Sequence, residues 1–304
     1  MNKKDVFDVL IVGAGAAGLT AAIYSSRYAL KTIIVSKDTG GLAATAHKIC
    51  NYPGFEEISG FELMQKVSNQ TIKLGVPIVN DEVIEIKKQD DIFYVKTRKE
   101  EYLSKKVIFS AGMQRRKLEV PGEDKLLGRG VSYCATCDAG FFRNKTVAVV
   151  GGSDAALTAA LLLSEFASKV YIIYRKEKFR AEPAWINSVN NEEKIEPVFN
   201  EEILEIVGDK KVESVRLKSG KSLNLDGVFI EIGSEPKLEL VENLGVQLEK
   251  NFIKTDKNQE TNISGFYAAG DITANELKQI VTACSQGAVA AFSCFEKLKN
   301  QDSQ

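Results

Sequence analysis

Cys134 and Cys137 are the residues of this sequence whose type and spacing best suit redox chemistry. Two intervening residues allow an intramolecular disulfide, and a helix N-terminus at the pair would lower a thiol pKa toward the thiolate that performs exchange. Asp138 follows directly, and the chain contains a single histidine. The Asp138 carboxyl group is therefore the best candidate to give a proton to a leaving thiolate.

A structural zinc site is the alternative interpretation of the cysteine pair, and such a site needs about four ligands. His47 and Cys50 are the residues that could complete it. A zinc-stabilised nucleotide-binding sensor is therefore an alternative function. We expect the remaining cysteines, Cys284 and Cys294, to be small buried hydrophobic residues of the last helix.

An internal repeat predicts the elements that position the cysteine pair. Residues 9–22 align with residues 147–160, and each stretch has a short apolar run, a glycine-rich turn and an alanine-rich helix. Each continues into a second β-branched strand, at residues 32–35 and 170–173. The repeat therefore predicts two parallel βαβ units.

Each glycine-rich turn could bind the pyrophosphate of a dinucleotide, because a helix N-terminus offers free N–H groups and a positive dipole end. The first turn has Gly13, Gly15 and Gly18 at the spacing of a dinucleotide fingerprint. In the second turn Ser153 stands in place of the middle glycine, and its Cβ would crowd the ligand. The first turn is therefore the stronger prediction of a nucleotide site.

The order of the remaining elements predicts two domains, as does a length of 304 residues, since single cores stop growing at about 250–300 residues. Strand-rich sequence at 83–86, 93–97 and 107–110 follows the first unit, and sequence at 212–217 and 228–232 follows the second. A helical stretch at 280–294 ends the fold. We expect an α/β protein with two Rossmann-like, three-layer nucleotide-binding domains, the second inserted into the first. Residues 1–113 and 245–304 would form the discontinuous first domain, and residues 114–244 the domain that carries the cysteine pair.

Composition excludes several classes of function. Forty basic and 41 acidic residues give a net charge of -1, which argues against a nucleic-acid partner. An odd count of five cysteines is unlike a secreted disulfide framework, so we expect a cytoplasmic protein. The apolar run at 9–24 is short and interrupted by glycines, and no other segment approaches ~20 apolar residues, so we expect no membrane span.

In order and spacing, these motifs resemble the low-molecular-weight thioredoxin reductases, which are class II FAD-dependent pyridine nucleotide-disulfide oxidoreductases, over almost the whole chain. The turn from Gly13 to Gly18 resembles the FAD fingerprint of that family, and Cys134-Ala135-Thr136-Cys137-Asp138 matches its redox-active motif with its acid. Asn51-Tyr52-Pro53-Gly54 resembles the loop beside the isoalloxazine. Residues 261–271 resemble the second FAD signature, and residues 278–283 the flavin-contacting turn that follows it.

The resemblance implies where each cofactor would bind. Asp38 would contact the adenosine ribose and Asp271 the ribitol side of FAD, whereas Leu42 replaces a glutamine that commonly bonds the flavin. The implied FAD residues are Gly13, Gly15, Ala16, Ala17, Gly18, Asp38, Gly41, Leu42, Asn51, Ala111, Gly112, Gly270, Asp271, Gln279 and Ile280. The implied NADPH residues are Gly151, Ser153, Asp154, Ala155, Arg175, Lys176 and Arg180.

The family's activity, carried over by resemblance, is a relay in which NADPH reduces FAD, FAD reduces the cysteine pair, and the dithiol reduces a thioredoxin-like protein. Cys137 would face the flavin and Cys134 would attack the partner's disulfide. The resemblance alone implies a homodimer.

The NADPH half departs from the family at Ser153, at Thr158-Ala159 in place of two glutamates, and at Tyr174 and Lys176. Its remaining cations still favour NADP over NAD, because a phosphate needs charge-assisted donors. NADH or reduced ferredoxin as donor, and a peroxidase-system protein as acceptor, are the alternatives.

Overall fold

The computed structural model describes residues 6–301 of the chain. It divides into two compact units, which we call unit 1 (Met1–Gln114 with Pro236–Gln304) and unit 2 (Arg115–Glu235). The second boundary therefore falls at 235/236, whereas the sequence placed it after residue 244. The reason is helix α6 (Glu239–Glu242), because its Val241 is buried in a core of unit 1 together with Leu10 and Phe266. No helix among the described residues is long and apolar enough to span a membrane.

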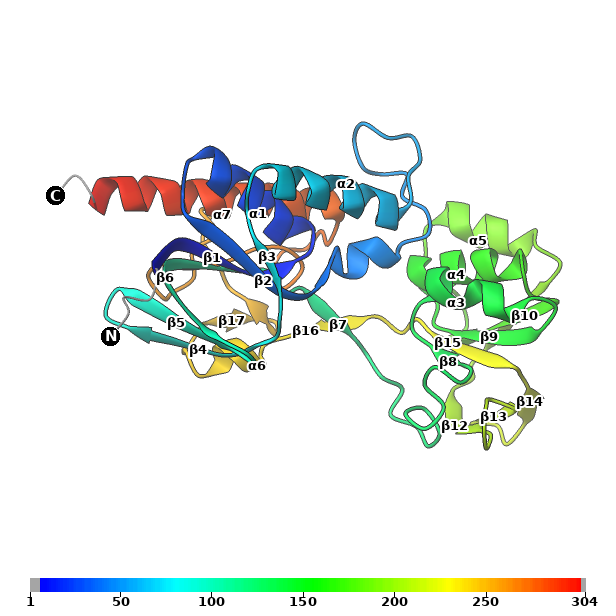
Figure 1. Cartoon of the computed structure of the whole chain (residues 1–304). Coiled ribbons are helices and arrows are strands. Elements are labelled where there is room, and N and C mark those ends of the chain that lie inside the picture. Colours follow the sequence, from blue (N-terminus) through cyan, green and yellow to red (C-terminus); the bar gives the residue numbers. More distant parts are fainter. Residues whose placement is uncertain (1–5, 302–304) are drawn as a thin grey trace. The chain divides into compact units, whose positions relative to one another are not determined.

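Unit 1 is built on a seven-stranded sheet in the order β3-β2-β1-β6-β5-β4, with β19 paired to β6 (Figure 1). The strands at its centre are parallel, and β4 and β5 join it antiparallel. The strands are β1 (Val6–Ala14), β2 (Thr32–Thr39), β3 (Ile78–Asn80), β4 (Val83–Gln89), β5 (Ile92–Thr97), β6 (Glu101–Phe109) and β19 (Phe266–Ala268). The repeat thus correctly predicts a parallel βαβ unit at the start of the chain.

Successive residues of β1 pack into two different cores, which explains its continuous apolar run. Val9 and Ile11 belong to the core under the helices, whereas Leu10 and Val12 belong to the core on the opposite face. Three helices, α1 (Ala16–Arg27), α2 (Gly60–Lys73) and α7 (Ile280–Gln301), lie together on one face of this sheet (Figure 1). The other face is covered by α6 and by the short hairpin of β17 (Leu248–Glu249) and β18 (Phe252–Ile253). A 3-10 turn, η1 (Gly41–Thr45), follows β2.

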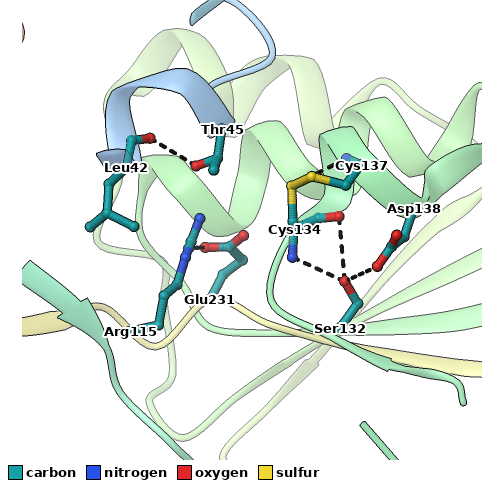
Figure 2. Close-up of a disulfide and its surroundings, with 8 residues drawn as sticks. All are labelled: Leu42, Thr45, Arg115, Ser132, Cys134, Cys137, Asp138 and Glu231. Carbon is teal, nitrogen blue, oxygen red and sulfur yellow. Dashed lines mark hydrogen bonds and ion pairs between the residues drawn. A yellow bond between two sulfur atoms is a disulfide. The ribbon is translucent and has the colours of Figure 1, made fainter. Parts of the chain in front are cut away.

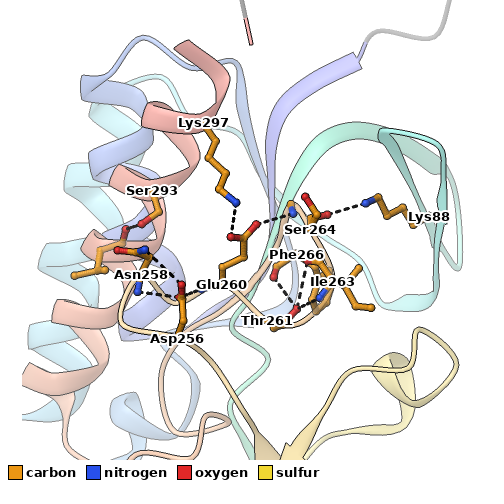
Figure 3. A network of polar contacts seen from close by, with 12 residues as sticks. Lys88, Asp256, Asn258, Glu260, Thr261, Ile263, Ser264, Phe266, Ser293 and Lys297 are labelled. Atoms are coloured by element: carbon orange, nitrogen blue, oxygen red, sulfur yellow. Dashed lines mark hydrogen bonds and ion pairs between the residues drawn. The ribbon is translucent and has the colours of Figure 1, made fainter. Parts of the chain in front are cut away.

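A polar network before β19 fixes how the chain enters the middle of unit 1 (Figure 3). The Thr261 hydroxyl donates to the Phe266 carbonyl at 2.9 Å and accepts from the Ile263 N–H at 3.1 Å. Glu260 accepts from the Gly265 N–H at 3.0 Å and forms an ion pair with Lys297 of α7. This loop therefore holds the strand that leads directly to Gly270 and Asp271.

Unit 2 has a five-stranded parallel sheet in the order β11-β10-β9-β15-β8. Its strands are β8 (Val131–Ser132), β9 (Thr146–Val150), β10 (Lys169–Tyr174), β11 (Ile195–Phe199) and β15 (Gly227–Ile230). Its helices are α3 (Ala135–Asp138), η2 (Ala139–Phe142), α4 (Asp154–Ser164) and α5 (Pro183–Asn190). A separate antiparallel sheet consists of β12 (Ile203–Val207), β13 (Ser214–Leu217) and β14 (Ser222–Asn224). The predicted α/β class with two Rossmann-like domains is confirmed.

Two short strands, β7 (Met113–Arg115) and β16 (Ser234–Pro236), pair with each other where the chain passes between the units. Arg115 of β7 also forms an ion pair with Glu231, which directly follows β15. The two crossings are therefore paired through their backbones, and the Arg115–Glu231 ion pair lies within unit 2.

Candidate active site

The cysteine pair lies where β8 passes into α3 of unit 2 (Figure 2). Cys134 is the N-cap of α3 and forms a disulfide with Cys137, with 5.3 Å between their Cα atoms. The Cys137 N–H points at the Cys134 Sγ at 3.2 Å. Once the disulfide is opened, this N–H is in place to stabilise a thiolate on Cys134.

Asp138 is bound by a residue on the other side of the cysteines. The Ser132 hydroxyl donates to the Asp138 Oδ2 at 2.6 Å, and the Cys134 N–H donates to the Ser132 Oγ at 3.0 Å (Figure 2). Ser132 is the last residue of β8 and is only 5% exposed. The acid of the redox segment is therefore held by a buried hydroxyl group.

A second carboxylate, Glu123, is hydrogen-bonded to Tyr133, the residue before Cys134. It is buried and accepts from the N–H groups of Leu118 at 2.9 Å and Glu119 at 2.7 Å, and from the Tyr133 hydroxyl. Burial and the Glu123 carboxylate together raise the pKa of Tyr133, so this residue stays a neutral donor beside Cys134. Sequence reasoning missed Ser132 and Glu123, since a single serine or glutamate carries no recognisable motif.

Unit 1 contains a cavity of about 680 Å³ at the carboxyl ends of its central strands, the usual position of a ligand in an open α/β sheet. Its wall combines the first glycine turn, the end of β2, η1, and the segments around residues 111 and 271. The predicted FAD residues that line it are Gly13, Gly15, Ala16, Ala17, Asp38, Gly41, Leu42, Ala111, Gly112, Gly270, Asp271, Gln279 and Ile280.

The first glycine turn fits a dinucleotide because each glycine has a separate task. Gly13 has φ +100°, and a Cβ there would lie 2.4 Å from the Ser110 carbonyl oxygen. A Cβ on Gly18 would lie 1.9 Å from the Gly13 carbonyl oxygen, so this glycine allows helix α1 to pack against the turn. A Cβ on Gly15 would meet no protein atom within 4 Å, which leaves the backbone open to a ligand. No acidic residue occupies the first turn of α1, so its N–H groups suit a pyrophosphate.

Among the charged residues that line the cavity, Asp271 and Lys278 interact with each other. Burial raises the pKa of Asp271, and the nearby Lys278 opposes that shift. Burial lowers the pKa of Lys278, whose ammonium donates to the Thr273 carbonyl at 2.6 Å. The Gln286 side chain accepts from the Gly270 N–H at 2.7 Å and so fixes the turn that carries Asp271. The Asp271 carboxylate can therefore accept from a hydroxyl group of a ligand in this cavity.

Gly18 and Asn51 are the predicted FAD residues that do not line this cavity. Gly18 acts in packing, and the Asn51 amide donates to the Gln279 Oε1 at 3.0 Å, so it reaches the cavity through its neighbour. Sequence reasoning missed two cavity cations, Lys37 and Lys237. Lys37 directly precedes Asp38 and could have been found from that position, whereas Lys237 lies in the stretch assigned to the other domain.

The second glycine turn, in unit 2, is contacted by its own chain. The Arg180 N–H donates to the Gly152 carbonyl at 2.6 Å, and the Glu182 N–H donates to the Asp154 Oδ1 at 2.7 Å. A Cβ on Gly152 would lie 2.5 Å from the Tyr174 ring. The loop at 175–182 therefore folds back onto the N-terminus of α4, where Ser153 is the N-cap and Ala155 lies in the first turn.

The predicted phosphate-binding cations lie on this loop. Arg175, Lys176 and Arg180 are exposed, and none of them forms an ion pair with another residue in the range 6–301. Glu177 and Glu182 therefore do not neutralise them through contact. Unlike α1, helix α4 begins with a carboxylate, that of Asp154, which is occupied by the Glu182 N–H.

The zinc alternative has no ligand set in the described part of the chain. No three His, Cys, Asp or Glu side chains between residues 6 and 301 are grouped so that they could hold a metal ion. The two cysteines that such a site requires form the disulfide.

Comparison with known proteins agrees with this geometry. The family model described as pyridine nucleotide-disulphide oxidoreductase matches residues 7–287. The thioredoxin reductase of Bacillus subtilis is 39% identical over 300 residues, which is 96% of this chain and 95% of the relative. The crystal structure of the Lactococcus lactis thioredoxin reductase is 39% identical, with a TM-score of 0.91 over 95% of this chain and 98% of that one. A ferredoxin-flavin thioredoxin reductase from Clostridium acetobutylicum is 38% identical, with a TM-score of 0.55 over 97% of this chain and 98% of that one.

The disulfide beside an acid, the dinucleotide cavity and these matches over nearly the full length lead to one assignment. The chain belongs to the pyridine nucleotide-disulphide oxidoreductase family, among its low-molecular-weight thioredoxin reductases.

Proposed function

We propose that this protein is an FAD-dependent thioredoxin reductase that transfers two electrons from NADPH, through FAD and the Cys134–Cys137 dithiol, to a disulfide of a thioredoxin-like protein. The observation that carries the proposal is a disulfide with a bound carboxylate in a chain that also holds a cavity suited to a dinucleotide. Bound FAD would supply a two-electron carrier between a nicotinamide and a disulfide.

The residues of unit 1 would bind and orient FAD. The free N–H groups at the start of α1 would hold its pyrophosphate, and Asp38 would accept from a ribose hydroxyl. Asp271 would accept from the ribitol chain, with Gln286 fixing its turn. Gln279, which is held by Asn51, would present a polar group to the isoalloxazine side.

The residues of unit 2 would exchange electrons with a protein disulfide. In our assignment Cys137 accepts electrons from the flavin and Cys134 attacks the partner, which agrees with the N–H donor placed at Cys134 Sγ. Asp138 gives a proton to a thiolate as the disulfide opens. The acceptor is a thioredoxin-like protein, and a peroxidase-system protein is the alternative.

NADPH is the proposed donor because three exposed cations without ion-pair partners in the described range lie on the loop that contacts the second glycine turn. A specific feature favours another donor, such as NADH or reduced ferredoxin. Ser153 and Asp154 place a Cβ and a carboxylate at the turn where a pyrophosphate would bind. The donor is therefore the part of the proposal that most needs an experiment.

An anaerobic titration of the purified yellow protein tests the proposal. NADPH, NADH and chemically reduced ferredoxin are added separately, and the flavin absorbance is followed. If NADPH bleaches the flavin at a lower concentration than NADH or ferredoxin does, the result supports NADPH as the donor. If only reduced ferredoxin bleaches it, ferredoxin takes the place of NADPH in the proposal. A protein that is colourless after refolding with excess FAD, or that never reduces thioredoxin with any donor, rejects the proposed function.

We also propose a cytoplasmic homodimer. Three free thiols in the described residues, Cys50, Cys284 and Cys294, agree with a reducing compartment. The homodimer rests on family membership, and light scattering after size exclusion measures it: a monomeric mass at micromolar concentration would contradict it.

A further inference from the structure

We propose that Ser132 is a positioning residue that holds Asp138 in both of its protonation states. Its hydroxyl group would reverse its hydrogen bonds each time Asp138 gains or loses a proton. This inference rests on the proposed function, in which Asp138 exchanges a proton with the cysteine pair. It assigns a task to a buried side chain outside the C-x-x-C-D motif.

One oxygen atom has three polar neighbours in the redox segment (Figure 2). The Ser132 Oγ lies 2.6 Å from the Asp138 Oδ2, 3.0 Å from the Cys134 nitrogen and 3.4 Å from the Cys134 carbonyl oxygen. Ser132 is 5% exposed, so bulk water does not compete for this oxygen. The Ser132 hydroxyl therefore connects Cys134, the N-cap of α3, to Asp138, the last residue of that helix.

The hydrogen-bonding capacity of a hydroxyl group matches both states of the acid. A hydroxyl has one hydrogen to donate and two lone pairs to accept with. When Asp138 is ionised, the hydrogen points at Oδ2 and one lone pair accepts from the Cys134 N–H. When Asp138 is protonated, its own O–H can donate to the second lone pair, and the Ser132 hydrogen turns to the Cys134 carbonyl. Neither state leaves a buried group unpaired, and no heavy atom has to move.

The proton and electron balance of the step is simple. When the disulfide opens, the S–S bond breaks and its two sulfurs become thiolates. Bound reduced flavin would supply the electron pair, and its own proton would go to solvent. The carboxylic acid of Asp138 gives its proton to one thiolate and becomes a carboxylate, while the second thiolate stays charged or takes a proton from water. Ser132 keeps its own proton and only rotates. When the dithiol passes two electrons to the partner disulfide, Asp138 takes a proton back.

Few titratable groups other than Asp138 lie near helix α3. Helix α4 and η2 pack against α3. Asp154 is the charged residue of α4, and its carboxylate is bound by the Glu182 N–H, while η2 has no charged residue. Before β8, Glu123 is buried and bound by two N–H groups and the Tyr133 hydroxyl. After reduction, the thiols of Cys134 and Cys137 also titrate, so a direct readout on Asp138 is needed.

The first readout is a carboxyl ¹³C titration of protein labelled at aspartate, in the oxidised and the thiol-reduced forms. Asp138→Asn identifies the resonance by its loss. In Ser132→Ala, the carboxylate loses a charge-assisted donor whereas the neutral acid loses only a neutral acceptor, so we expect the Asp138 midpoint to rise. In Ser132→Thr, which keeps the hydroxyl, we expect it to stay within about 0.3 units of the wild type. Ser132→Cys is nearly isosteric with serine but is a weaker donor, so its Asp138 midpoint should lie between those of the alanine and threonine variants. It replaces the alanine variant in this test if that variant does not fold.

The second readout is the pH profile of thioredoxin reduction. We expect the limb that Asp138→Asn abolishes to move to higher pH in Ser132→Ala, with the rate in the plateau kept within about threefold. An alanine variant that titrates like the wild type, or that loses rate equally at every pH, would overturn the inference. If the wild type reduces thioredoxin but Asp138→Asn leaves the profile unchanged, the inference fails and the relay stands. If the relay itself fails, the carboxyl titration still reports on Ser132 and Asp138.

Discussion

At the scale of single residues, the redox segment depends on side chains that flank the cysteines rather than on the motif alone. The motif supplies two sulfurs and a carboxylate, while Ser132 and Glu123 fix their positions through buried hydrogen bonds. The disulfide partners and their acid could be predicted from the sequence because they are consecutive. Ser132 and Glu123 could not, because their role arises only when β8 and the loop before it fold together.

The two sulfurs should be distinguishable by trapping. We expect Cys137→Ser to form a stable mixed disulfide with a thioredoxin whose resolving cysteine is serine, and Cys134→Ser to form none, because Cys134 is the proposed attacking sulfur. Either variant should lose turnover by about 10³-fold or more. Non-reducing electrophoresis with mass spectrometry detects the adduct, and Cys50→Ser, an exposed cysteine outside the pair, is the control. Trapping through Cys137 instead would reverse the assigned order.

The glycine turn of unit 1 allows affinity and folding to be separated. Gly15→Ala adds a Cβ that meets no protein atom, so we expect a folded protein with unchanged unfolding of its apo form and at least about tenfold weaker FAD binding. Gly13→Ala should instead destabilise unit 1, because its Cβ would collide with the Ser110 carbonyl. Flavin fluorescence titration and thermal unfolding measure the two effects, with Gly140→Ala in unit 2 as the control. If Gly15→Ala binds FAD as tightly as the wild type does, the first glycine turn is not the pyrophosphate site.

At the scale of elements, Arg115 of strand β7 pairs with Glu231, a carboxyl group of unit 2 that titrates within the accessible pH range. Burial raises the pKa of Glu231 to about 7, and Arg115 lowers it in part. A carboxyl group whose pKa is higher in the folded state stabilises the fold fully below its unfolded pKa, and this contribution is lost as pH rises through the folded pKa. Glu231 should therefore make unit 2 less stable as the pH increases from about 4.5 to about 7.

The variant Glu231→Gln should remove this dependence. We expect the difference in unfolding free energy between wild type and variant to change by about 1–3 kcal/mol between pH 4.5 and 8. The single tryptophan, Trp185, lies in unit 2 and reports its denaturant unfolding by fluorescence. Glu235→Gln is the matched control, because Glu235 also pairs with an arginine, Arg116, but is far more exposed than Glu231. Parallel pH curves for wild type and Glu231→Gln would show that Glu231 titrates at its ordinary value.

Element boundaries show what local patterns could and could not predict. The repeat correctly predicts β1, α1 and β2, because each forms from residues close in sequence. Helix α7 was predicted to end at residue 294 but continues to Gln301, since Leu298 is buried and Lys297 pairs with Glu260. Residues 236–244 were assigned to the wrong side of the boundary because their helix α6 is short and its burial depends on distant strands.

At the scale of the whole molecule, the chain carries two versions of one nucleotide-binding plan that differ in how open they are. The first turn lines a cavity of about 680 Å³, and the second is contacted by its own loop at 175–182. The glycine pattern could predict this ranking, since a Cβ at Ser153 was visible in the sequence. The contacts of Arg180 and Glu182 with the turn could not be predicted, because they depend on how the loop folds back.

The central claim is that the flavin and the Cys134–Cys137 disulfide exchange two electrons within one chain. An anaerobic dithionite titration of the purified flavoprotein tests it most directly, because it counts electrons per flavin. The account predicts that the wild type takes up about twice as many electrons before the flavin is fully bleached as the Cys134→Ser/Cys137→Ser variant does. Equal uptake by the two proteins would contradict it.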